Sequence, residues 1–154
     1  MTMSQRPAMS VTSVTINAPD PRALAAFYVR LLGWNLTAEE PPRPGRPPGD
    51  GWAQVRPPEG AAGPTLNFEY DEAGYVRPVW PSEAGEQQSM EHLDIAVADL
   101  GAAVAWALSA GATLADYQPQ DDVRVMLDPV GHPFCFFLVD PSFFPAAVSP
   151  GARG

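Results

Sequence analysis

Near its start the chain alternates hydrophobic and polar residues, and a helical pattern follows. Residues 11–17, VTSVTIN, alternate and are rich in β-branched side chains, which is typical of a half-buried β-strand. Asp20 and Pro21 come next, as the N-cap and first residue of a helix would. Large apolar residues then recur at intervals of three and four until Gly33, a typical helix stop. The sequence therefore predicts a strand over 11–17 and a helix over 21–32.

The same succession of signals returns in the second half of the chain. Residues 91–97, EHLDIAV, alternate like the first strand, and Asp99 and Gly111 stand where a helix would begin and end. Trp106 occupies a position of this second helix that we expect to lie in the core. Three short strand patterns follow each helix, at 34–37, 52–56 and 65–70 in the first copy and at 113–117, 122–127 and 134–139 in the second. The chain is thus predicted to contain a duplicated βαβββ module.

The duplication sets the expected boundaries along the chain, whose 154 residues suit one domain or two small halves with a shared core. We expect a first module at 11–70 that includes a proline-rich loop at 39–64, a polar connector at 71–90, a second module at 91–140 and a C-terminal tail at 141–154. In the tail, Phe143 and Phe144 are adjacent and could pack on a neighbouring molecule.

The composition narrows the classes of partner. Lys plus Arg number 9 and Asp plus Glu number 18, a formal net charge of -9 that disfavours nucleic acids and anionic membrane surfaces. A cationic or neutral ligand is easier to accommodate. A single cysteine, Cys135, excludes an internal disulfide and is typical of a reducing compartment. Neither a membrane-spanning stretch nor the apolar core of a signal peptide is visible, so we expect a cytoplasmic protein.

Four segments together carry a resemblance to a known superfamily. They are NAPDPRALAAFYVRLLGW, HLDIAVADL, AGAT and LDPVGHPFCFFLVD. Over residues 11–140 the chain resembles the glyoxalase, bleomycin-resistance and extradiol-dioxygenase superfamily, also called the vicinal oxygen chelate (VOC) superfamily. The resemblance implies an α+β fold in which the curled mixed sheets of two tandem βαβββ modules surround a shared cleft. Members of this superfamily commonly hold a divalent metal ion in that cleft.

The resemblance also implies positions for the metal ligands, one on the first strand and one on the last strand of each module. His92 matches the pattern in the second module, whereas Ser13, at the corresponding position of the first module, is a poor metal donor. On the last strands, Cys135 stands in place of the usual carboxylate, and the first-module position falls on either Asn67 or Glu69. We therefore expect no tightly bound metal and no other cofactor. The alternative is one divalent ion held by His92, Glu69 and Cys135.

Alternation within the strands predicts which side chains face away from the helices. The cleft is expected to be edged by polar side chains from several strands and by an aromatic side chain at a strand edge, where it can stack on a planar or cationic ligand. These candidate ligand-binding residues are Ser13, Thr15, Asn67, Glu69, Arg124 and Trp52. On the strand that carries Arg124, we expect Val123, Val125 and Leu127 to face the helix instead.

His92 and Asp94 share the polar face of one strand, about 6 to 7 Å apart between Cα atoms. One of them could accept a proton while the other serves as its partner or as a counter-charge for a ligand, since histidine exchanges protons readily at neutral pH. A hydrogen-bonded polar pair without a catalytic role is the other interpretation. Cys135 lies among phenylalanines with no base near it in the sequence, so we interpret it as a core residue.

Two functional hypotheses follow from these residues and from the resemblance. The first is a homodimeric protein that binds a small organic molecule, cationic or aromatic, in the cleft between its modules without a tightly bound metal. The second is an enzyme of the VOC type. It would be either a metal-dependent lyase, isomerase or dioxygenase, or a metal-free acid-base catalyst that uses His92 and Asp94.

Overall fold

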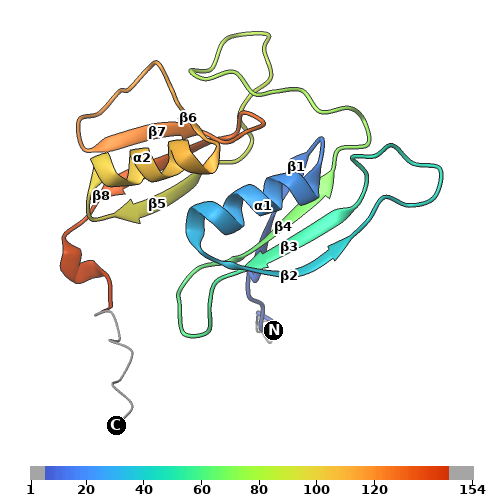
Figure 1. The fold of residues 1–154 in the computed structure, drawn as a ribbon, viewed down its shortest axis with the longest axis horizontal. Helices are drawn as coiled ribbons and strands as arrows, with labels where there is room; N and C mark the ends of the chain where they lie inside the picture. Colours follow the sequence, from blue (N-terminus) through green and yellow to red (C-terminus); the bar gives the residue numbers. More distant parts are fainter. Residues whose placement is uncertain (1–5, 146–154) are drawn as a thin grey trace, which may run out of the picture. The chain divides into compact units, whose positions relative to one another are not determined.

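The computed structural model describes residues 6–145, which form two compact units divided between Tyr75 and Val76. Each unit contains one long helix and four strands in the order β-α-β-β-β (Figure 1). The predicted α+β fold of two βαβββ modules is therefore confirmed. The dividing point falls inside the segment predicted as the connector, and the predicted tail beyond residue 145 lies outside the described residues.

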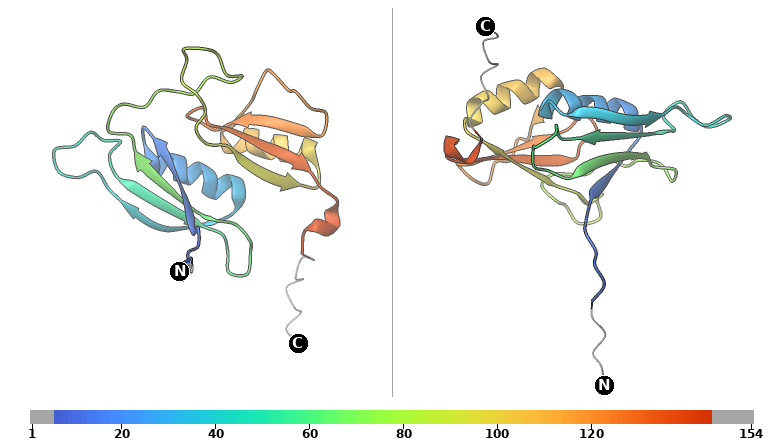
Figure 2. Two further views of the ribbon diagram at one scale, coloured as in Figure 1. Left: turned by 180° about the vertical axis from the view of Figure 1, so that it is seen from behind. Right: turned by 90° about the horizontal axis from the view of Figure 1, so that it is seen from below.

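The first module is a mixed four-stranded sheet with helix α1 (Pro21–Leu32) packed on one face (Figure 2). Its strands are β1 (Ser13–Ala18), β2 (Asn35–Glu40), β3 (Trp52–Arg56) and β4 (Thr65–Tyr70). They lie side by side in the order β1-β4-β3-β2. β1 and β4 are parallel, and the chain between them, which includes α1 and two strands, is long enough for the crossover that parallel pairing needs; β3 is antiparallel to both of its neighbours.

Helix α1 spans the predicted residues and has the expected caps. Asp20 accepts a hydrogen bond from the backbone N–H of Ala23 (3.1 Å), and Gly33 ends the helix at φ 67°, in the left-handed region that glycine tolerates. Tyr28 is fully buried, and its ring stacks on Phe68 of β4 with 5.5 Å between centroids. The apolar side of α1 thus covers one face of the sheet and leaves the other face to polar side chains.

The second module repeats this arrangement. Helix α2 (Leu100–Ala110) packs on a sheet of order β5-β8-β7-β6, in which β5 and β8 are parallel (Figure 1). The strands are β5 (Leu93–Val97), β6 (Thr113–Leu114), β7 (Val123–Leu127) and β8 (Pro133–Leu138), and a short 3-10 helix, η1 (Pro141–Phe143), follows. Within residues 6–145, no helix is both long and apolar enough to cross a membrane.

Strand β6 is shorter than the predicted 113–117, and a side chain explains why. The amide group of Gln118 accepts a hydrogen bond from the backbone N–H of Val125 (2.8 Å) and donates one to its C=O (2.9 Å). A longer β6 would have satisfied backbone groups of β7 in the same way. The side chain of Gln118 therefore replaces the end of the edge strand.

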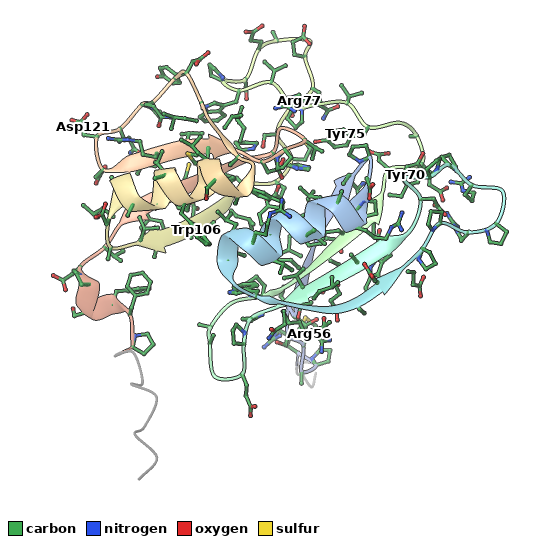
Figure 3. The ribbon with its side chains drawn as sticks, in the orientation of Figure 1. Arg56, Tyr70, Tyr75, Arg77, Trp106 and Asp121 are labelled. Carbon is green, nitrogen blue, oxygen red and sulfur yellow. The ribbon has the colours of Figure 1, made fainter. Side chains whose placement is uncertain are left out.

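The prediction that Trp106 lies in the core is wrong. Its side chain projects from α2 and is 58% exposed, whereas Ala107 and Ala110 supply the buried side chains of that helix (Figure 3). Consecutive residues of a helix point about 100° apart, so burial of Ala107 turns Trp106 away from the sheet.

Candidate functional site

The face of the first sheet opposite α1 carries rows of polar side chains. Cross-strand partners share a face, and the register aligns Asn17, Glu69, Trp52 and Glu40 across β1, β4, β3 and β2. The next row along the sheet contains Thr15, Asn67 and Gln54, and Ser13 follows on β1. The structure thus brings the predicted residues Ser13, Thr15, Asn67, Glu69 and Trp52 onto one face.

Asn67 and Glu69 differ in how their side chains are engaged. The Asn67 side-chain carbonyl accepts a hydrogen bond from Gln54 (3.0 Å), and Gln54 in turn accepts one from the hydroxyl of Thr37 (3.0 Å). Glu69 is exposed and takes part in no ion pair among the residues that the structure describes. Asn67 and Glu69 were the two candidates on this strand. Only Glu69 has a carboxylate, and this carboxylate remains available to a ligand.

A cavity of about 410 Å³ lies beside the row that contains Trp52, and we call it the first-module pocket. Trp52 is half-buried and has Glu40 as its neighbour on one side and Glu69 on the other. Tyr70, which ends β4 (Figure 3), also lines the pocket and adds a second aromatic ring to it. The sequence pattern did not indicate Glu40 and Tyr70 as lining residues, because their position depends on the pairing register of β2, β3 and β4.

The proline-rich loop forms one wall of this pocket and is anchored by a buried carboxylate. Asp50 is 1% exposed and accepts three hydrogen bonds from Arg43: one from the backbone N–H (2.9 Å) and two from the guanidinium (2.7 and 3.0 Å). These bonds hold the pKa of Asp50 well below its usual range and raise that of Arg43.

A second acidic residue at the rim is engaged in the same way. Glu72 accepts a hydrogen bond from Arg43 (2.7 Å) and pairs with Arg46 (3.1 Å), and the bond from Arg43 is the main reason why its pKa is lowered. Two of the four carboxylates that line the pocket, Asp50 and Glu72, are thus neutralised by arginines. Glu40 and Glu69 are the two that remain to meet a ligand.

The second module has its own cavity, also about 410 Å³, which we call the second-module pocket. Its lining residues are His92, Asp94, Gln120, Val123, Cys135 and Phe137. His92 immediately precedes β5, and the parallel pairing of β5 with β8 places Asp94 beside Cys135. His92 Nε2 lies 2.9 Å from Cys135 Sγ and 3.4 Å from Asp94 Oδ1. The predicted pair of His92 and Asp94 is therefore a group of three side chains.

Cys135 is 6% exposed, in agreement with its prediction as a core residue. It packs with Ala115 and Val125, and Trp80 from the connector lies against this cluster with its ring edge-on to His92 at 6.4 Å. Burial, together with the negative charge of Asp94, raises the pKa of the Cys135 thiol. The sequence did not indicate a base for this cysteine, because His92 lies 43 positions away in the chain.

The placement of Arg124 on the ligand-binding face is corrected by the structure. Arg124 pairs with Phe136 on the helix side of the sheet, whereas Val123 and Val125 share the pocket side with Cys135. The guanidinium donates to the backbone carbonyls of residues 120, 121 and 123 and so holds the turn before β7. The prediction assumed that the apolar side chains of this strand face the helix. It failed because the pocket side of this module is itself partly apolar.

Glu91, which directly precedes His92 in the chain, carries a buried carboxyl group. Both side-chain oxygens of Glu91 are buried without a hydrogen-bond partner among the described residues. Desolvation raises the pKa of Glu91 to about 7; the negative charge of Asp128 adds to this effect, and His132 opposes it. His132 is itself buried and lies 2.7 Å from Asp128, between Nδ1 and Oδ2.

The VOC resemblance implies a divalent metal, and the second-module donors can be tested for it. The ligand atoms of His92, Asp94 and Cys135 all lie within 4.8 Å of one another. Two donors bound to one tetrahedral zinc, at about 2.0 and 2.3 Å from it, would lie about 3.5 Å apart. The 2.9 Å between His92 and Cys135 is instead the separation of a hydrogen-bonded pair, and a thiol with a raised pKa must first lose its proton. This donor set therefore fits a tightly bound metal poorly. The alternative set that adds Glu69 from the first module stays a prediction.

The fold and the polar sheet faces define an α+β protein built from two βαβββ modules, the architecture of the VOC superfamily. Comparison with protein families matches residues 13–137 to the glyoxalase-like domain, and the chain belongs to this family. Among curated proteins there is no match.

Several solved structures are similar to this chain. A glyoxalase family protein from Enterococcus faecalis has 22% identity, a TM-score of 0.58, and coverage of 83% of this chain and 96% of that one. A glyoxalase/bleomycin resistance protein/dioxygenase family enzyme from Burkholderia phytofirmans PsJN has 18% identity, a TM-score of 0.59, and coverage of 85% and 99%. TnmS3, an antibiotic binding protein from Streptomyces sp. CB03234, has 19% identity, a TM-score of 0.51, and coverage of 87% and 98%. At these identities the likeness shows a shared fold.

Proposed function

We propose that this glyoxalase-like protein binds a small organic molecule that carries both an aromatic ring and a positive charge, without a tightly bound metal. The observation that carries the proposal is the position of Trp52 in the first-module pocket, between Glu40 and Glu69, whose carboxylates form no ion pair with the residues that the structure describes. A planar cation could stack on the indole while a carboxylate balances its charge. The pocket is of the size that ordinary small ligands fill.

Charge supports a cationic ligand over an anionic one. The four lining carboxylates of this pocket face the single lining arginine, Arg43, which is already bonded to Asp50 and Glu72. The whole chain has a formal net charge of -9, so its field also favours cations. TnmS3 is an antibiotic binding protein, so a protein with this fold can bind an antibiotic.

Calorimetric titration with a matched pair of ligands tests the proposal. N-methylacridinium, a planar cation, should bind more tightly than neutral N-methylacridone, because only the cation interacts favourably with the two carboxylates. Trp52→Ala and Glu69→Gln should each weaken the binding of the cation by about 1 to 2 kcal/mol. Glu39→Gln is the control, since Glu39 lies on the same strand as Glu40 but does not line the pocket. Equal affinity for both ligands, or wild-type affinity in both pocket variants, would contradict the proposal.

Three finer parts of this function remain predictions. They are a cleft lined by residues of both modules, a homodimer, and a location in the cytoplasm. Phe143 and Phe144 support the dimer, since both are exposed and pack edge-to-face on each other, with 5.4 Å between ring centroids. A ligand whose affinity falls in both Glu69→Ala and His92→Ala would support the shared cleft, because these residues belong to different modules.

A second candidate function is metal-free acid-base catalysis of the kind found in a lyase or isomerase. The contact of 3.4 Å between His92 and Asp94, at the edge of the second-module pocket, supports it. His92 would exchange a proton with a bound substrate, and Asp94 would stabilise the imidazolium. A substrate turned over by the wild type and not by His92→Gln, in dialysed protein with chelator present, would establish this activity. Turnover that requires an added divalent metal would instead favour the metal-dependent alternative.

A further inference from the structure

The only cysteine of the chain has a base beside it and a cavity in front of it. Cys135 and His92 lie 2.9 Å apart between Sγ and Nε2, and both line the second-module pocket. Cys135 comes from β8, and His92 from the residue just before β5, so the parallel pairing of these strands positions both. A thiol, a base and an adjoining cavity together are the components of a nucleophilic site.

We infer that the second-module pocket captures electrophilic small molecules covalently, by addition of the Cys135 thiol to the β-carbon of an α,β-unsaturated carbonyl compound. His92 is the general base. This inference concerns a different pocket from the one in the proposed function and does not rest on it.

The reaction requires only the thiol, the base and the bound molecule. Neutral His92 accepts the thiol proton at Nε2 as sulfur forms a bond to the β-carbon of the ligand. The electrons of the C=C double bond move toward the carbonyl and give an enolate, and the imidazolium returns the proton to the α-carbon. The product is a thioether. The S–H bond and the C=C π bond are lost, one C–S bond and one C–H bond are formed, and neither an oxidant nor a leaving group is involved.

The surroundings of Cys135 explain why a base is needed. Burial keeps the sulfur as a thiol at neutral pH, and a thiol is a much weaker nucleophile than a thiolate. His92 Nε2 is in position to remove the proton at the moment of attack, and Asp94 Oδ1, 3.4 Å from the same nitrogen, stabilises the positive charge that His92 then carries.

The lining of the pocket favours an apolar ligand with a hydrogen-bond acceptor. Val123 and Phe137 form apolar parts of its wall. Gln120 also lines the pocket, and its side-chain amide can donate a hydrogen bond to an acceptor such as a ligand carbonyl. A cyclic enone combines the apolar body, the acceptor and the electrophilic carbon.

The inference is tested by following the reaction of the folded protein with 2-cyclohexenone by intact-mass spectrometry. The wild type should gain the mass of one enone, and Cys135→Ser should gain none, because the chain has a single cysteine. At pH 7, His92→Gln should react at least about tenfold more slowly than the wild type. Asp116→Asn, which removes an exposed charge outside the pocket, should react at the wild-type rate.

The pH profile distinguishes a missing base from a damaged pocket. Above the pKa of the thiol, sulfur is ionised without help, so the rates of the wild type and His92→Gln should converge. A rate deficit that persists at all pH values would mean that His92 only shapes the pocket and would overturn the inference. Equal rates at pH 7 would overturn it as well, as would failure of the folded wild type to react when the same protein in denaturant is fully modified.

Discussion

The pH dependence of stability should be governed in part by one buried carboxyl group, Glu91. Neither of its side-chain oxygens has a hydrogen-bond partner among the described residues, so its ionised form is poorly stabilised in the folded protein. Replacement by glutamine keeps the shape of the side chain and removes the charge. We therefore expect Glu91→Gln to increase the free energy of unfolding at alkaline pH.

The size and sign of the effect follow from the pKa of Glu91, which rises from 4.5 to about 7 on folding. Because the folded state binds this proton more tightly, the wild type loses stability as the pH rises from 4.5 to 7. Each pH unit corresponds to about 1.4 kcal/mol, so the loss is at most about 3 kcal/mol. The charges nearest to Glu91, those of Asp128 and His132, act on it in opposite directions and partly cancel.

The assay is urea unfolding of the wild type and Glu91→Gln at several pH values between 4 and 8. The two proteins should be similarly stable at pH 4, where Glu91 is protonated, and should differ by up to about 3 kcal/mol at pH 8, with the variant more stable. Glu83→Gln is the control, since Glu83 is exposed in the connector. A difference between the wild type and Glu91→Gln that does not change with pH would refute the reasoning.

Three further predictions concern the loop anchor, metal content and assembly. Asp50→Asn should lower the melting temperature, because it removes the carboxylate that binds Arg43. Glu59→Gln, in the exposed loop between β3 and β4, should leave the melting temperature unchanged in a thermal melt. Elemental analysis of purified protein should find well under one equivalent of Zn, Mn, Fe or Ni; stoichiometric metal that survives dialysis and is lost in His92→Ala would be the opposite result. Light scattering should report a homodimer, and a mass near 16.5 kDa at tens of micromolar protein would count against it.

Local signals in the sequence were sufficient to predict the elements of the fold. Asp20 and Gly33 mark the ends of α1 because capping depends on residues within one turn of the helix. The duplication then identified the second module, but the two helices differ in detail. Trp106 follows Phe27 by the 79 residues that separate the two copies, yet Phe27 is buried and Trp106 is exposed.

The candidate sites depend on pairings that no local signal reveals. His92 meets Cys135 only because β5 lies parallel to β8, and Glu40 joins Trp52 only through the register of β2 with β3. Arg124 was placed on the wrong face because β7 carries apolar residues on both of its sides. Where one face of a strand is polar, as in β4, alternation predicted the orientation correctly.

The central claim, that a small aromatic cation stacks on Trp52, is tested most directly by the indole N–H signals in the NMR spectrum of ¹⁵N-labelled protein. The chain has four tryptophans, and the signal of Trp52 is identified by its absence in Trp52→Phe. Titration with N-methylacridinium should shift the Trp52 signal strongly and saturably, with the affinity measured by calorimetry. A Trp52 signal that stays in place while the calorimeter records binding would contradict the claim.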